Sequence, residues 1–164
     1  MNLEMRTGGW QESKGNKLMD IISELISKDE KSAYELAGKI ISESHETDKW
    51  YGFFDEIVTL LNHKNSLVRN RGLFILAANA RWDSENKFER ILPTYLSHVT
   101  DPKPITARQC VKALSEVGRA KPNLIPDILN ALAKADLSGY KDSMRPLIEK
   151  DIRETTEELT ELSL

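Results

Sequence analysis

Residues 53–61 read FFDEIVTLL, and residues 91–99, which lie 38 positions later, read ILPTYLSHV. Both stretches have apolar residues at positions i, i+1, i+4, i+5 and i+8, which form one face of an amphipathic helix. A related face recurs 37 positions further on, within residues 125–132, and 36 positions earlier, within residues 18–25. These similar spacings indicate four copies of one structural unit.

Each unit has the pattern of two antiparallel helices, because turn-forming Asn, Ser, Pro and Gly residues interrupt the helical periodicity at regular places. Strand signals are almost absent, and no Asn-Gly or Asp-Gly hairpin occurs. The chain is therefore predicted to be all-α. We expect a flexible tail at 1–16, a repeat domain at 17–152 with units near 17–43, 50–82, 85–120 and 123–152, and a charged turn or short helix at 153–164.

The composition limits the class of protein and its location. The 164 residues are 40% hydrophobic and 30% charged, with a net charge of −3 and one cysteine. This balance excludes a charge-dominated disordered chain, and a single cysteine excludes a disulfide framework. No apolar run approaches the roughly 18–20 residues of a membrane span, and the first residues lack the apolar core of a signal peptide. We expect a cytoplasmic protein without membrane contact.

The openings of the second helices support a family resemblance. These openings are Ser66-Leu67-Val68-Arg69 and Ile105-Thr106-Ala107-Arg108, and Pro93 and Pro126 lie in the preceding helices. With a period of roughly 40 residues, the pattern resembles HEAT repeats and their armadillo relatives. The resemblance implies an α–α superhelix, or solenoid, of about four helix pairs. The chain is also similar to small bacterial HEAT-like proteins that are sometimes labelled SufBD, after iron–sulfur assembly.

Catalytic and metal-binding motifs are not evident. His45, His63 and His98 fall in three different units and lack metal-ligand spacing. Cys110 cannot hold an iron–sulfur cluster by itself, and its alignment with Gly72 indicates a small residue at a close helix contact. No glycine-rich phosphate loop occurs. We therefore expect a non-enzymatic protein with no catalytic residues, metal or cofactor.

Charge is segregated along the chain. Residues 66–82, 103–121 and 139–153 carry net charges of +3, +4 and +1, whereas the remainder carries −11. Because second helices line the concave side of HEAT-like solenoids, the resemblance implies a basic concave face. The candidate binding residues on it are Arg71, Arg81, Trp82, Arg108, Lys112, Arg119 and Arg145. In the alternative interpretation, Arg69, Arg108 and Arg145 make structural contacts with loop acids and carbonyls.

The basic face predicts a scaffold that binds an anionic macromolecule, most simply another protein, with nucleic acid also possible. A second hypothesis comes from the resemblance to bacterial alkylpurine DNA glycosylases of HEAT-like architecture. In that case Trp82 and Asp83 would face the lesion, and Arg71, Arg81 and Arg108 would contact phosphates.

Overall fold

The computed structural model describes residues 21–164, and every regular element in that range is helical. The prediction of an all-α protein is thus confirmed for this range. The predicted tail at 1–16 lies outside the described residues, as does the beginning of the helix predicted from residue 17, of which residues 21–25 are described as helical. The helices are α2 (Glu30–Ser44), α3 (Phe54–Val58), α4 (Ser66–Asn79), α5 (Lys87–Ser97), α6 (Pro104–Ala120), α7 (Ile125–Lys134) and α8 (Arg145–Leu162). Short 3-10 helices extend them at Tyr51–Phe53, Thr59–Asn62, Ala80–Trp82, His98–Thr100 and Pro122–Leu124.

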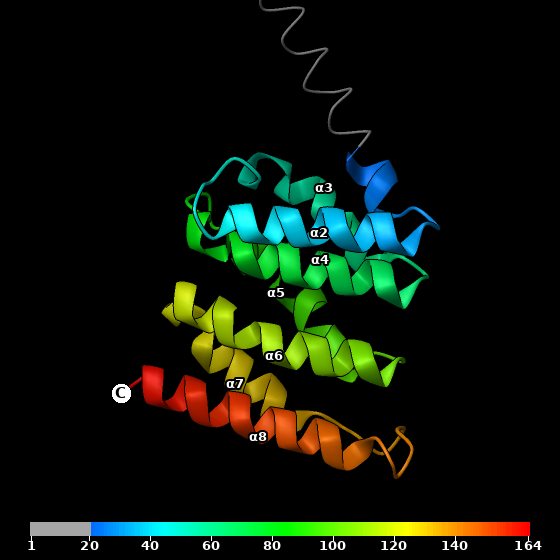
Figure 1. The fold of residues 1–164 in the computed structure, drawn as a ribbon. Helices are drawn as coiled ribbons and strands as arrows, with labels where there is room; N and C mark the ends of the chain where they lie inside the picture. Colours follow the sequence, from blue (N-terminus) through cyan, green and yellow to red (C-terminus); the bar gives the residue numbers. More distant parts are fainter. Residues whose placement is uncertain (1–20) are drawn as a thin grey trace, which may run out of the picture.

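The four long helices α2, α4, α6 and α8 lie side by side in chain order (Figure 1). They point in the same direction, so their first turns lie along one edge of the molecule, which we call the N-terminal edge. The shorter helices α3, α5 and α7 lie behind this layer and connect each long helix to the next (Figure 1). Successive long helices are therefore neighbours, and α2, α4, α6 and α8 together present one continuous outer surface.

Side-chain caps begin the helices at defined residues. The Asn65 side chain accepts a hydrogen bond from the Leu67 amide at 2.9 Å, which satisfies one of the unpaired donors of the first turn of α4. The Asp83 carboxylate accepts from the amides of Lys87 and Phe88, each at 2.8 Å, and so holds the first turn of α5. Polar side chains of the loops thus fix the residues at which α4 and α5 begin.

Two glycines allow close packing between helices. A Cβ atom at Gly72 of α4 would lie 3.0 Å from the Cβ of Leu60, and one at Gly118 of α6 would lie 2.4 Å from a methyl carbon of Leu159. Cys110, which aligns with Gly72 in the repeat register, is fully buried and donates to the Tyr95 carbonyl at 3.4 Å. Small residues are therefore needed where these helices approach, as the sequence predicts.

The last unit differs from the prediction. Helix α7 ends at Lys134, and α8 runs unbroken from Arg145 to Leu162, so the predicted boundary after residue 152 is wrong. The apolar face of α8 continues past that point, because Leu159 is fully buried and the Thr155 hydroxyl donates to the Val111 carbonyl at 3.1 Å. Packing against α6 thus keeps the charged C-terminal segment in one helix. No helix of residues 21–164 combines the length and apolar character that crossing a bilayer requires.

Candidate binding groove

Arg71, a candidate of the basic face, is buried between α2 and α4. One guanidinium nitrogen donates to the Leu25 carbonyl at 2.8 Å, and another pairs with the Glu30 carboxylate. The side chain is only 7% exposed, so its charge is used inside the fold. Arg71 therefore lines the groove described below with its charge already paired to Glu30.

Arg81 and Trp82 join the C-terminal ends of three long helices. Arg81 donates to the Glu116 carboxylate at 2.9 Å and to the His45 carbonyl at 3.2 Å. The Trp82 indole N–H donates to the Ser44 carbonyl at 2.7 Å. Both side chains keep some exposure, but their polar groups already have partners within the fold.

Arg108, Arg119 and Arg145 are also paired, whereas Lys112 is not. Arg108 donates to the buried Asp151 carboxylate at 2.6 Å, and this contact raises the pKa of the guanidinium. Arg119 lies 3.4 Å from Glu158, and Arg145 donates to the Tyr140 carbonyl at 3.0 Å and pairs with Asp142 at 3.2 Å. Exposed Lys112 forms no ion pair with any residue from 21 to 164. Of the predicted basic residues, Lys112 alone offers a charge that is not neutralised in this range.

The structural alternative for Arg69 is confirmed by a buried ion pair. Its guanidinium binds both carboxylate oxygens of Asp101, at 2.9 and 2.7 Å, and donates to the carbonyls of His63 and Lys64. Burial raises the pKa of Asp101, but hydrogen bonds from Arg69, the Lys103 amide and His98 outweigh it and leave the pKa below its ordinary value. This pair fastens the start of α4 to the loop before α6.

Asp83, which would face the lesion in the glycosylase hypothesis, uses both carboxylate oxygens for hydrogen bonds within the fold. Besides capping α5, its carboxylate accepts from the Tyr51 hydroxyl at 2.6 Å and the buried Lys121 ammonium at 2.7 Å. Burial raises the pKa of Asp83, but the hydrogen bonds from Lys121, Tyr51 and the amides of α5 outweigh this effect and leave the pKa below its ordinary value. The arrangement is that of a structural carboxylate, and it leaves the hypothesis without an available acid at this position.

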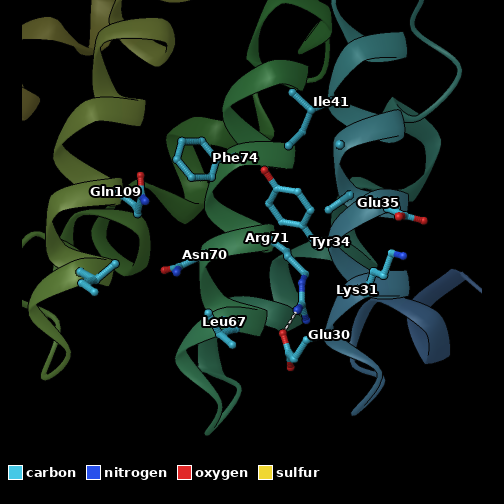
Figure 2. Close-up of a pocket in the computed structure, with 13 residues that line it drawn as sticks. Glu30, Lys31, Tyr34, Glu35, Ile41, Leu67, Asn70, Arg71, Phe74 and Gln109 are labelled. Carbon is cyan, nitrogen blue, oxygen red and sulfur yellow. Dashed lines mark hydrogen bonds and ion pairs between the residues drawn. The ribbon is translucent and has the colours of Figure 1, made fainter.

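The outer surface of α2, α4 and α6 carries an apolar groove with a volume of about 800 Å³. Tyr34 of α2 and Phe74 of α4 point toward one another across it (Figure 2). Tyr34 is 76% exposed, Ile105 is 60% exposed and Leu67 is 46% exposed, which is unusual for large apolar side chains. The amides of Asn70 and Gln109 also line the groove.

Of the binding residues predicted from the sequence, only Arg71 lines this groove. The signal was available in the repeat register, because a shift of 38 places Leu67 on Ile105, each the second residue of its helix. Their exposure could not be inferred from that register alone. Polar positions in the groove are informative too: the side-chain oxygen of Asn70 is buried and forms no hydrogen bond with a described residue.

Within residues 21–164, no three His, Cys, Asp or Glu side chains are grouped so that they could hold a metal ion. No protein-family model matches the chain, and neither the curated proteins nor the solved structures include a significant match. The groove and its surrounding charges are therefore the features from which function is inferred.

Proposed function

We propose that this chain is a HEAT-like superhelix of about four helix pairs that acts as a non-enzymatic binding module. Its site is the groove across α2, α4 and α6, and its ligand is a segment of another protein that carries apolar anchor residues. The repeat spacings of 36, 38 and 37 support the superhelix, as do long helices that pack in chain order. A stacked array of this kind offers an extended surface for recognition.

The exposed apolar side chains on three successive helices carry the proposal. Tyr34, Leu67 and Ile105 leave more than two-fifths of their surface in contact with water. Full burial of one such aliphatic side chain is worth about 1.5–3 kcal/mol, so a partner that covers the groove gains substantial free energy. Aromatic anchors such as Tyr34 are also common among residues that dominate binding energy.

Polar groups in the groove suit a peptide backbone. Asn70 and Gln109 bear amides that both donate and accept hydrogen bonds, and the Asn70 oxygen has no partner among the described residues. A peptide backbone presents N–H and C=O groups that pair with amides of this kind, whereas a purely apolar ligand would leave them unpaired. Lys112 lies one turn beyond Gln109 on α6, which agrees with the expected anionic character of the partner.

The test is selection of twelve-residue peptides on the full chain from a displayed random library, followed by affinity measurement. Selected peptides should bind Leu67→Asp at least about tenfold more weakly than the parent protein, a difference of about 1.4 kcal/mol. Leu162→Asp is the matched control, because Leu162 is also 46% exposed but lies outside the groove. Equal affinity for the parent and Leu67→Asp would refute the proposal.

A further inference from the structure

A row of four exposed lysines repeats with the period of the chain. Lys28, Lys64, Lys103 and Lys141 are separated by 36, 39 and 38 residues, and each lies in the segment that leads into a long helix. All four are exposed. We call them the lysine row.

The first two lysines of the row lie immediately before helix caps. Lys28 precedes Asp29, the N-cap of α2, and Lys64 precedes Asn65, the N-cap of α4. Both therefore lie at the N-terminal edge, at neighbouring positions because α2 and α4 pack side by side (Figure 1).

The other two lysines lie in the corresponding segments before α6 and α8, but at different distances from the N-cap. Lys103 is the N-cap residue of α6, and the Lys141 carbonyl accepts from the amides of Met144 and Arg145 at 2.9 and 3.0 Å, where α8 begins. Lys103 thus lies at the N-terminal edge, and Lys141 lies in the loop before α8, which contacts the loop before α6 through a hydrogen bond from the Tyr140 hydroxyl to the Asp101 carbonyl at 2.5 Å.

No lysine of the row forms an ion pair with a residue between 21 and 164. The acidic residues beside the row are already engaged. Asp29 accepts from the Ser32 amide at 3.3 Å, Asp101 is paired with Arg69, and Asp142 lies 3.2 Å from Arg145. The positive charges of the row are consequently available to a partner.

Exposed aliphatic side chains accompany the row. Leu67, Ile105 and Leu147 lie in the first turns of α4, α6 and α8, and they are 46%, 60% and 38% exposed. Leu67 and Ile105 also line the groove, so the groove and the row form one continuous surface. From α4 to α8, this surface offers a cation and an apolar contact at the start of each successive long helix.

We propose that the lysine row binds an acidic protein segment that crosses the long helices in a polyproline II conformation, with an acidic residue at every third position. Packed helices lie about 8–10 Å apart, and polyproline II advances about 9 Å per three-residue turn. One face of the segment therefore meets successive lysines, and the next face meets the aliphatic side chains. This inference rests on the proposed function and specifies the partner of the same surface.

An acidic protein fits this surface better than nucleic acid does. The exposed side chains in the first turns of α4, α6 and α8 are aliphatic, and among the described residues Tyr34 is the single large aromatic side chain of the groove that is strongly exposed. Single-stranded nucleic acids bind instead on several aromatic side chains that stack with successive bases.

The probe is a fluorescein-labelled peptide of four Glu-Leu-Pro repeats, titrated with the full chain by fluorescence anisotropy. The double variant Lys64→Glu/Lys103→Glu should weaken binding at least about tenfold. Lys39→Glu/Lys134→Glu is the matched control, because it changes net charge equally at exposed lysines outside the row and the groove, and it should alter affinity less than about threefold. Replacing every Glu of the peptide by Gln should reproduce the loss with the parent protein.

The outcomes separate this inference from the proposed function. If Leu67→Asp weakens peptide binding and the lysine double variant matches its control, the groove proposal stands and the lysine row is refuted. Absence of binding of the Glu-Leu-Pro peptide also overturns the row, while the library selection tests the groove independently. Tighter binding of a labelled uridine oligonucleotide or of phosphatidylglycerol vesicles, lost in the double variant, would instead assign the row to nucleic acid or lipid. Circular dichroism melting confirms that each variant is folded.

Discussion

The buried pair between Arg69 and Asp101 should contribute more to stability than any exposed ion pair of the chain. Asp101→Asn removes the negative charge but keeps an oxygen that can accept from the Lys103 amide, which the carboxylate now binds at 2.9 Å. The Arg69 side chain is 11% exposed and the Asp101 side chain 1% exposed, so the remaining guanidinium charge would stay largely out of water.

Breaking a buried pair from one side costs about 3–5 kcal/mol. The Arg69 guanidinium retains its bonds to two backbone carbonyls, at 2.9 and 3.1 Å, which moderates the loss. We therefore expect Asp101→Asn to lower the free energy of unfolding by about 2–4 kcal/mol at pH 7. Urea denaturation followed by circular dichroism measures this difference.

Asp55→Asn is the comparison, because Asp55 pairs with Lys87 at 3.1 Å but is 73% exposed. An exposed pair of this kind is worth less than about 1 kcal/mol. A double-mutant cycle with Arg69→Met should give a coupling energy of more than about 1 kcal/mol for the buried pair. If Asp101→Asn lowered the free energy of unfolding as little as Asp55→Asn does, the conclusion that Arg69 and Asp101 fasten adjacent units would be wrong.

Three further predictions concern acid stability, glycine packing and thiol reactivity. The folded-state pKa values of Asp83 and Asp101 lie below their ordinary values, so both carboxylates stabilise the folded protein above about pH 4. This contribution to the free energy of unfolding is lost as the pH falls through the folded-state pKa values, and urea denaturation at a series of pH values between about 6 and 2 measures the loss. Gly38→Ala should stabilise the protein by about 0.5–1 kcal/mol, because a Cβ atom there meets nothing within 4 Å. Gly118→Ala should destabilise it by about 1–2 kcal/mol, because a Cβ atom there lies 2.4 Å from the buried Leu159 side chain. The melting temperature should rise for the first variant and fall for the second. Burial raises the pKa of the Cys110 thiol, so a disulfide reagent such as dithionitrobenzoate should modify it only upon unfolding, and rapid reaction of the folded protein would contradict its buried position.

The helices and their repetition followed from the sequence because helical periodicity is local. Residues 53–61 and 91–99 display the same apolar face; α3 lies within the first stretch and α5 overlaps the second. The close approach at Cys110 was likewise predictable, because its alignment with Gly72 showed a position that accepts only a small side chain. The end of the chain was less predictable, since Thr155 and Leu159, which extend the buried face of α8 past residue 152, contact α6 from a distant part of the chain.

The availability of each charge was decided by the tertiary structure. Helices α4 and α6 are basic, as the sequence indicated, whereas α2 and α8 carry more acidic than basic residues. Whether Arg71 or Arg108 faces a partner depends on Glu30 and Asp151, which lie 41 and 43 residues away in the chain. The lysine row was visible as a period near 38, yet only the folded chain shows that its lysines lie before adjacent long helices and lack ion pairs with the described residues. Periodicity arises from local backbone geometry, whereas the neutralisation of a charge requires side chains that folding brings together across units.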